Sequence, residues 1–228
     1  MTEGPFVPAE RRPEAFAHRS PETAAADVSA AASRFGPGPM WRVGGPQGGS
    51  VLVPEPFLVA GGLNVTPDSF YDGGAHDTCG AALAHGLALG RCGADMVDVG
   101  GESTRPGSDP VPGDVELGRV VPVVRGLVRA FADPGFALAP DCGQGLFPPT
   151  APRPLVSVDT RRAACAAACL EAGAAIINDV SALSADPGLV DVLVQYRPGY
   201  VLMHSQGPPK TMQAAPAYDH VADTVLAF

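Results

Sequence analysis

Charged residues are scarce in this sequence: they make up 17% of its 228 residues, against about a quarter in an average soluble domain. The charge that remains is mostly negative, because 24 acidic and 15 basic side chains give a net charge of −9. Nucleic acids and anionic membranes select clustered Lys and Arg, so the composition argues against both as partners. An anionic small-molecule substrate would need Arg, Lys, a metal ion or backbone N–H groups placed locally around it.

The sequence also lacks the marks of export and of a membrane span. No apolar run reaches the roughly 18 residues that a spanning helix needs. Residues 1–16 contain prolines and acidic side chains where a signal peptide has an apolar core. The five cysteines form no Cys-x-x-Cys pair and no His–Cys spacing typical of zinc sites. We interpret them as reduced thiols and predict a cytoplasmic protein.

Hydrophobic residues are plentiful, at 46%, but they are distributed unevenly along the chain. Residues 1–38 are rich in Ala, Pro and charge, which predicts a flexible extension ahead of one domain over 39–228. Short apolar pieces broken by Gly and Pro over Met40–Pro56 predict a small hairpin. Residues 133–151 are dense in Pro and Gly, which indicates a surface insertion on the side of the domain away from its functional end.

From Phe57 onward, short apolar runs alternate with helical patterns. The runs are rich in Val, Ile and Leu and end in polar residues and Gly, and apolar residues on both faces are what a buried parallel strand requires. The predicted strands are Phe57–Val65, Ala94–Gly100, Pro154–Asp159, Ala174–Val180 and Gly199–His204. The predicted helices are Thr78–Cys92, Val115–Ala132, Arg161–Ala172 and Pro187–Tyr196, with a fifth beginning near Tyr218. Thr160 is the expected N-cap of the third helix, and Gly173 is its expected C′ residue.

Five strand–helix repeats predict an α/β domain with a parallel sheet, for which an open doubly wound sheet and a (β/α)₈ barrel both fit the count. Polar residues follow every predicted strand, namely Asn64, Asp98 to Glu102, Asp159, Asn178 with Asp179, and His204. In a barrel all these strand ends surround one mouth, whereas an open sheet places a site only beside its switch point. We therefore predict the first five β/α units of a TIM (β/α)₈-type barrel.

The first two polar segments contain candidate binding groups. Asn64 offers an uncharged amide that can bind a metal ion, a phosphate or the edge of a heterocycle. The loop after it mixes Asp, Ser, aromatic residues and a Gly-Gly pair, a composition that suits a lid over substrate and a solvated turn equally well. Asp98 is expected to point into the mouth. Glu102 is expected to need a partner, and Arg105 is either a clamp for pyrophosphate or carboxylate or simply that partner.

The next segments place a carboxylate beside an amide. Asp159 and Asn178 end neighbouring predicted strands, and together they complement the donors and acceptors of an aminopyrimidinone ring. Asp179 is better explained as a helix N-cap than as a chemical group. His204 is a candidate base, although a lone His at a strand end is more often a structural hydrogen-bonding residue.

Taken together, these motifs resemble the dihydropteroate synthase family. LNVTPDSF, DVGGESTRPG, SVDT, IINDV and MHSQGPPKTMQ occur in the family's order and spacing between about Phe57 and Phe228. The resemblance implies that 6-hydroxymethyl-7,8-dihydropterin pyrophosphate condenses with p-aminobenzoate to give 7,8-dihydropteroate and pyrophosphate. It also implies that Asn64 binds Mg²⁺ carried by the pyrophosphate.

The resemblance further implies two catalytic residues. Asp72, in the first loop, would stabilise the cationic pterin after pyrophosphate departs, and Arg105 would act from the second loop. The residues implied in substrate binding are Asp98, Asp159 and Asn178 on the pterin side, with Thr104, Phe70 and Pro106 from the loops.

The family continues with three further strands and helices, and the complete enzyme is expected to be a homodimer. We therefore expect the 228 residues to be inactive as a monomer and prone to associate, because the sheet would keep open edges. Two alternatives are a non-catalytic pterin-binding fragment and, with less support, a pterin-dependent methyltransferase. Methyltransferases of that kind lack the LNVTPDSF and GGESTRPG loops.

Overall fold

The computed structural model describes residues 41–44, 49–52, 58–66, 78–102, 110–137, 153–207, 212 and 216–228. Its main sheet has five parallel strands, which are β3 (Ala60–Asn64), β4 (Met96–Gly100), β5 (Leu155–Asp159), β6 (Ile176–Asp179) and β7 (Gly199–Leu202). Their order in the sheet is their order in the chain, without the reversal that creates a switch point in a doubly wound sheet. Each strand lies within the run predicted for it.

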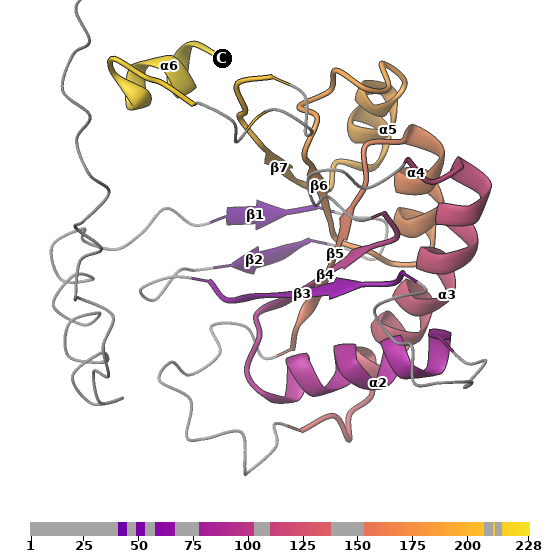
Figure 1. Ribbon diagram of the computed structural model, residues 1–228. Helices are drawn as coiled ribbons and strands as arrows, with labels where there is room; N and C mark the ends of the chain where they lie inside the picture. The colour runs from indigo at the N-terminus through magenta and orange to yellow at the C-terminus, as the bar shows by residue number, and fades with distance from the viewer. Residues whose placement is uncertain are drawn as a thin grey trace, which may run out of the picture. The chain divides into compact units, whose positions relative to one another are not determined.

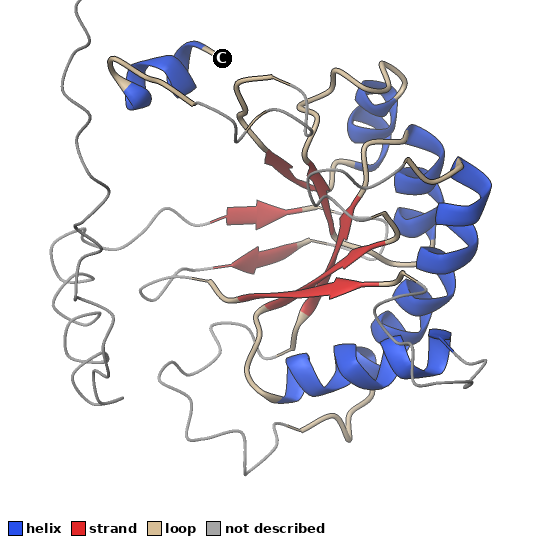
Figure 2. Ribbon diagram, in the orientation of Figure 1, coloured by secondary structure: helices blue, strands red, loops and turns tan. Residues whose placement is uncertain are grey.

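Helices join consecutive strands on one side of this sheet (Figures 1 and 2). They are α2 (Thr78–Arg91), α3 (Gly113–Ala132), α4 (Ala163–Glu171) and α5 (Leu189–Tyr196), and α6 (Val221–Ala227) follows β7. Helices on a single face leave the other face of the strands to form an interior, as in a barrel. The described part of the chain is therefore the first five β/α units of a (β/α)₈-type barrel.

The outer face of the sheet and the helices make the main core. Because side chains alternate along a strand, β4 and β5 direct Val97, Val99, Val156 and Val158 toward the helices, where all are buried. Leu127 of α3 is fully buried in the same cluster. Removing a side chain of this size from a packed core costs about 2–5 kcal/mol.

The predicted hairpin consists of antiparallel β1 (Trp41–Val43) and β2 (Ser50–Leu52). It covers the inner face at the amino-terminal ends of the strands. Val43 and Leu52 pack there against Met96 and Ile176 in a second, smaller cluster. The amino-terminal ends of β4 and β6 are thus filled by apolar side chains. Polar chemistry on the inner face is left to the carboxyl-terminal ends.

Two predictions for the ends of α4 have different outcomes. Gly173 is the C′ residue as expected: its φ is +102°, and a Cβ there would lie 2.7 Å from Cγ1 of Val128. The prediction of Thr160 as N-cap is wrong, because the N-cap position is Arg162. The first N–H of the helix, that of Ala163, donates to Oδ2 of Asp186 at 2.8 Å. The Thr160 hydroxyl oxygen accepts the preceding N–H, that of Arg162, at 3.2 Å.

The cysteines only partly match the expectation of reduced thiols. Cys79, Cys165 and Cys169 are free, and the last two are buried in the core of α4. Cys92 is disulfide-bonded, which corrects the prediction for that residue. None of the described helices is long and apolar enough to cross a membrane.

The two edges of the main sheet are β3 and β7. On β7, Val201 and Leu202 are exposed, at 37% and 51%, and Val194 on α5 is exposed at 68%.

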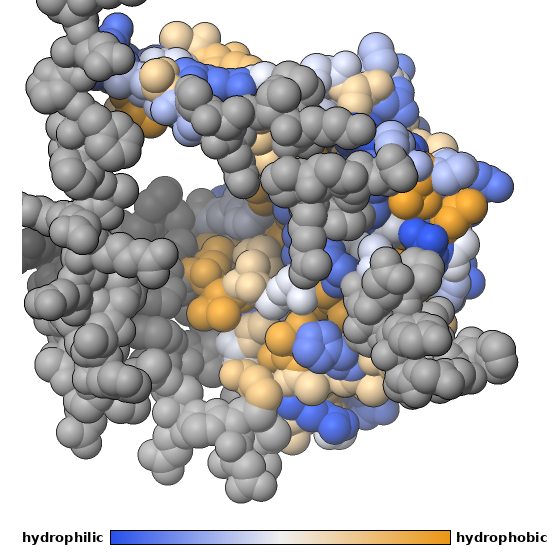
Figure 3. All heavy atoms as spheres, viewed as in Figure 1, coloured by the Kyte–Doolittle hydropathy of each residue, from blue (hydrophilic) through white to orange (hydrophobic). Residues whose placement is uncertain are grey.

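Apolar and polar residues are interspersed over the face seen in Figure 3. Residues 37–228 belong to one compact unit. The predicted extension over 1–38 and most of the insertion over 133–151 lie outside the described residues.

Candidate active site

A row of residues crosses four strands at their carboxyl-terminal ends. The strand register pairs Asn64 with Gly100, Gly100 with Asp159, and Asp159 with Asn178. Gly100 has no side chain to fill the middle of this row. A Cβ at Gly100 would lie 3.5 Å from Oδ1 of Asn64 and 3.5 Å from Oδ2 of Asp159. An amide and a carboxylate therefore face the same open space above Gly100.

Asp98 lies on the same face, two residues before Gly100, and it orients the neighbouring polar groups. Its Oδ1 accepts from the Ser157 hydroxyl at 2.6 Å, and its Oδ2 accepts from Nδ2 of Asn178 at 2.8 Å. Because Asn178 donates through Nδ2, its carbonyl Oδ1 faces away from Asp98 as an acceptor. The structure thus brings together Asp98, Asp159 and Asn178, as the sequence predicts.

Asp159 has an unusual environment for a carboxylate. Burial, followed by the negative charges of Asp98, Glu116, Glu102 and Asp179, raises the pKa of Asp159 to about 7. None of the hydrogen bonds among the described residues involves the Asp159 carboxylate. A ligand that offers N–H donors would stabilise the ionised form of this group.

A cluster of charged side chains lies beside this row. Glu102 follows β4, and its two oxygens accept from Nη2 of Arg161 at 2.7 Å and from Nη1 of Arg162 at 2.9 Å. The expectation that Glu102 needs a partner is confirmed by these two arginines. Arg105, the partner that the sequence suggested, lies outside the described residues. Arg162 also bonds Glu116, a fully buried carboxylate in the first turn of α3. Burial opposes the charge on Arg162, but the hydrogen bonds to Glu116 and Glu102 hold its pKa above its usual value.

Thr160 connects the cluster to the row. Its hydroxyl donates to Oε1 of Glu116 at 2.7 Å, and its backbone N–H donates to the carbonyl oxygen of Asn178 at 3.1 Å. The residue directly after Asp159 is therefore held both by α3 and by β6. This arrangement fixes the backbone that presents the Asp159 carboxylate.

Asp179 has a structural role, but not the one predicted. It is fully buried, and it accepts from the backbone N–H groups of Ser181 at 2.8 Å and Leu183 at 2.6 Å and from the Tyr200 hydroxyl at 2.9 Å. Burial opposes its ionisation, but these bonds hold its pKa below its usual value. Helix α5 begins only at Leu189, so Asp179 stabilises a turn rather than capping a helix.

His204 behaves as a structural residue. Its Nδ1 lies 3.5 Å from the Tyr218 hydroxyl, and its ring meets the Phe228 ring edge-on at 4.8 Å between centroids. Both of these contacts are with aromatic side chains that flank α6. The structural interpretation is the better one here.

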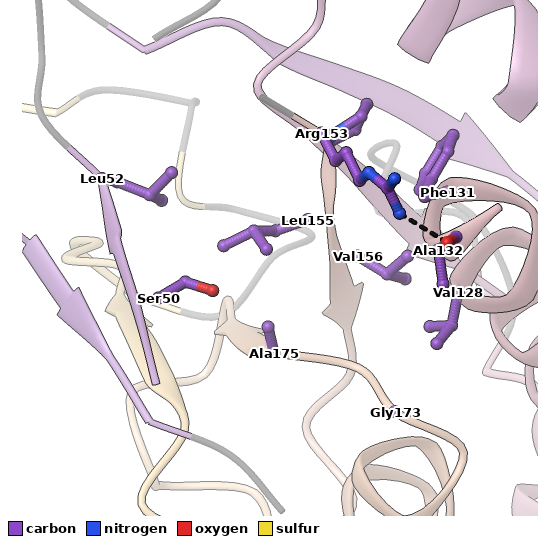
Figure 4. A pocket seen from close by; sticks show the side chains of 11 residues that line it. Ser50, Leu52, Val128, Phe131, Ala132, Arg153, Leu155, Val156, Gly173 and Ala175 are labelled. Atoms are coloured by element: carbon purple, nitrogen blue, oxygen red, sulfur yellow. Dashed lines mark hydrogen bonds between the residues drawn. The ribbon is translucent and has the colours of Figure 1, made fainter. Parts of the chain in front are cut away.

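A cavity of about 490 Å³ lies at the opposite ends of the strands (Figure 4). It is lined by Leu155 and Ala175, which precede the polar ends of β5 and β6, and by apolar residues of α3. Leu155 and Asp159 are the two ends of β5, so the cavity is about 13 Å from the polar row. It contains none of the candidate residues, and we place the site at the polar row instead.

Five further candidate residues follow β3 and β4 in the sequence. Asp72, Phe70, Thr104, Arg105 and Pro106 all lie outside the described residues. Asn64 is described, and its side chain is exposed toward the open space. Among the described residues no group of three His, Cys, Asp or Glu side chains could hold a metal ion.

Sequence reasoning missed three residues that organise this region. Ser157 is a polar residue in the middle of a buried strand, and this break in the apolar pattern was an available signal. Glu116 and Arg162 carry charges on helical segments, which from sequence alone look like ordinary solvated positions. Their pairing joins positions 46 residues apart, and no local pattern reveals it.

Active sites of (β/α)₈-type barrels lie at the carboxyl ends of the strands, which is where the row of Asn64, Asp159 and Asn178 lies. Residues 60–134 and 148–228 match the family described as pterin binding enzyme. The chain belongs to this family.

Individual relatives agree with the family. The chain is 40% identical over 175 residues to the dihydropteroate synthase of Escherichia coli K12, which covers 77% of this chain and 54% of that protein. A dihydropteroate synthase structure from Xanthomonas albilineans with 4-aminobenzoic acid matches with a TM-score of 0.59 and 42% identity, over 77% of this chain and 54% of that one. A structure of the enzyme from the same organism with 7,8-dihydropteroate matches with a TM-score of 0.53 and 40% identity, over 74% and 50%. The chain thus spans about half the length of each of these three proteins.

Proposed function

We propose that this chain acts in dihydropteroate synthesis, joining 6-hydroxymethyl-7,8-dihydropterin pyrophosphate to p-aminobenzoate with release of pyrophosphate. The supporting observation is the row of polar groups above Gly100, with Asp159 and Asn178 side by side over Asp98. The similar solved structures add support, because the dihydropteroate synthase of Xanthomonas albilineans has been solved with 4-aminobenzoic acid and with 7,8-dihydropteroate.

In this proposal the pterin ring lies at the carboxyl ends of β4, β5 and β6. Asp159 accepts hydrogen bonds from the N–H groups of the aminopyrimidinone edge, and Asn178 supplies a second acceptor whose direction is set by its bond to Asp98. Burial destabilises the ionised Asp159 carboxylate when no ligand is bound. Such donors would therefore stabilise it strongly, since charge-assisted hydrogen bonds are roughly twice as strong as neutral ones.

The chemical step needs no strong nucleophile from the protein. The pterin C–O bond to pyrophosphate breaks, the electron pair leaves with pyrophosphate, and the p-aminobenzoate nitrogen attacks the resulting cationic carbon and then loses a proton. The carboxylates around the site favour positive charge on the pterin. We assign Asp72 to the stabilisation of that cation and Arg105 to the pyrophosphate, with Thr104, Phe70 and Pro106 as substrate contacts.

Mg²⁺ is part of the proposal. The exposed Asn64 amide faces the open space above Gly100, and Mg²⁺ commonly takes one or two protein oxygens with the rest from water and substrate phosphates. One neutral oxygen donor therefore fits an ion that arrives on the pyrophosphate. When bound, the ion would neutralise charge on the leaving group.

The test combines binding and turnover. Calorimetry should show 6-hydroxymethylpterin binding to the 228-residue chain, weakened by about 1.5–3 kcal/mol in Asp159→Asn and unchanged by Asp191→Asn on the exposed face of α5. Dihydropteroate formation from p-aminobenzoate is measured for the chain alone and for the chain extended by the remaining half of the Escherichia coli relative. We expect product from the extended form. Pterin binding without product in either form would favour the non-catalytic alternative, and no pterin binding at all would sink the proposal.

A further inference from the structure

Ser157 is a buried polar residue in the middle of β5, and its hydroxyl contacts a carboxylate on the neighbouring strand. It is in register with Asp98 of β4 and is only 1% exposed. The Ser157 hydroxyl donates to Oδ1 of Asp98 at 2.6 Å. Because the terminal torsion of an Asp side chain has only broad energy minima, this bond limits the rotation of the Asp98 carboxylate and holds Oδ2 toward β6.

The bond from Asn178 to Asp98 crosses the strand that carries Ser157. Asn178 of β6 donates through Nδ2 to Oδ2 of Asp98 on β4 at 2.8 Å. Neighbouring strands are about 4.8 Å apart, so the two side chains together span roughly 10 Å over β5. Ser157 is small enough to leave this path open, whereas a branched apolar side chain in its place would occupy it.

A second carboxylate lies closer to the Asn178 amide in the sheet. Asp159 is the register partner of Asn178 on the adjacent strand, so proximity alone favours a bond between these two residues. The structure shows the longer, diagonal bond instead. The Ser157 hydroxyl favours the diagonal bond, because it fixes the Asp98 carboxylate in the orientation that receives the amide.

We propose that Ser157 is a positioning residue that directs the Asn178 amide to Asp98 and thereby leaves the Asp159 carboxylate free for the ligand. This inference rests on the proposed function, in which that ligand is the pterin. Ser157 lies one inner-face position before Asp159 on β5, so it acts through Asp98 and Asn178 rather than on the ligand itself. The site then offers two acceptors on neighbouring strands, the Asp159 carboxylate and Oδ1 of Asn178.

Ser181 provides a matched control within the same chain. Its hydroxyl donates to Oδ1 of Asp179 at 2.7 Å, so Ser181→Ala removes the same type of bond as Ser157→Ala. Asp179 keeps three other donors in that variant, and Asn178 is not among them. A serine–aspartate bond is therefore lost in both variants, but only Ser157→Ala frees the Asn178 amide to change its partner.

The partner of the amide is tested without ligand by ¹³C NMR of the Asp159 carboxyl carbon, assigned from its absence in Asp159→Asn. The pKa of this group is raised to about 7 by burial first and then by the negative charges of Asp98, Glu116, Glu102 and Asp179. In Ser157→Ala the amide of Asn178 can donate to Asp159, which favours the ionised form, so the midpoint should fall by about one pH unit. Ser181→Ala should leave it within about 0.3 pH unit. An unchanged midpoint in Ser157→Ala would overturn the inference.

A double-mutant cycle separates this effect from a simple loosening of the site. Water admitted around Asp159 would also lower its midpoint, but it would do so with or without the Asn178 amide. In the background of Asn178→Ala, Ser157→Ala should shift the midpoint by less than about 0.3 pH unit. The same shift in both backgrounds would show that Ser157 does not act through Asn178, and the inference would be wrong.

The functional consequence is tested by calorimetry with 6-hydroxymethylpterin at pH 8. Ser157→Ala should bind the pterin about fivefold more weakly, because only the part of the protein that keeps Asp159 free is competent to bind. Ser181→Ala should stay within about twofold of the unaltered chain. Equal affinities for Ser157→Ala and the unaltered chain would refute the role in ligand binding.

Two further outcomes are separable. If Ser157→Ala does not fold, Ser157→Cys replaces it, because it has a similar shape and a thiol is only a weak donor. The midpoint should then fall by about half a pH unit, and no fall would contradict the inference. If the unaltered chain does not bind the pterin, the proposed function fails, while the titration and its cycle still decide whether Ser157 directs the Asn178 amide.

Discussion

Replacing Asp159 by Asn should make the protein more stable and its pterin binding weaker, and the two effects should depend on pH. The pKa of Asp159 is raised from 3.8 to about 7 by burial and by neighbouring carboxylates. A difference of about three pKa units corresponds to roughly 4 kcal/mol of strain on the ionised form in the folded state. Because part of the group remains in contact with solvent, this value is a ceiling.

The direction follows from proton linkage. Between about pH 4 and pH 7 the unfolded chain has lost the proton of Asp159 while the folded protein keeps it, so wild-type stability falls as pH rises through this window. Above pH 7 both states are ionised, and the full penalty persists. Below pH 4 both are protonated, and the penalty vanishes. Asn does not titrate, so the stability advantage of Asp159→Asn should grow from near zero at pH 4 to at most about 4 kcal/mol at pH 8.

The assay is urea unfolding of wild type, Asp159→Asn and the exposed control Asp191→Asn at pH 4, 6 and 8. In parallel, calorimetry with 6-hydroxymethylpterin at pH 8 should show a loss of about 1.5–3 kcal/mol for Asp159→Asn. Wild-type affinity should fall by up to about tenfold per pH unit below pH 7, because the ligand selects the ionised carboxylate. Stability curves for wild type and Asp159→Asn that run parallel across this range would refute the reasoning.

Three further predictions concern neighbouring residues. Gly100→Ala should change stability by less than about 1 kcal/mol, because the new methyl meets Asn64 and Asp159 at ordinary contact distances of 3.5 Å, but calorimetry should show about tenfold weaker pterin binding; unchanged affinity would move the ligand elsewhere. Asp179→Asn should lower the free energy of unfolding by about 1–3 kcal/mol at pH 7. Since the folded pKa of Asp179 is lowered, this difference should shrink as pH falls below about 4, and a constant difference would contradict the assignment. Asp72→Ala should reduce kcat of the extended form far more than pterin affinity, and equal losses would indicate a ground-state contact.

The strands of this fold were predictable because buried strands are short segments rich in apolar residues, and such segments are visible in the sequence. Met96–Gly100 and Leu155–Asp159 carry valine at each position that faces the helices, and their inner faces begin with the apolar Met96 and Leu155. Such Val-rich runs are typical of buried parallel strands. The ends were less certain: β3 begins at Ala60 rather than at Phe57. The helix end at Gly173 was readable from a single glycine, whereas the start at Arg162 was not, because its capping acceptor, Asp186, comes from 23 residues away.

The candidate site was predictable only as far as strand ends determine it. Asn64, Asp98, Asp159 and Asn178 follow apolar runs, so parallel pairing alone brings them to one edge of the sheet. Which of them bond one another depends on side-chain reach across the sheet. Asn178 passes over its register partner Asp159 to donate to Asp98, two strands away.

That choice of partner has a chemical consequence that no motif contains. Asp98 accepts hydrogen bonds from Ser157 and Asn178. Of the two carboxylates Asp98 and Asp159, only Asp159 therefore receives no hydrogen bond from the described residues, and its pKa is raised. If Asn178 donated to Asp159 instead of to Asp98, the carboxylate without this donor would lie on β4. The N–H edge of the ligand would then be expected at β4. The location of the binding charge is thus a property of the sheet's register and of the Asn178 amide, and it can be altered by residues that need not touch the ligand.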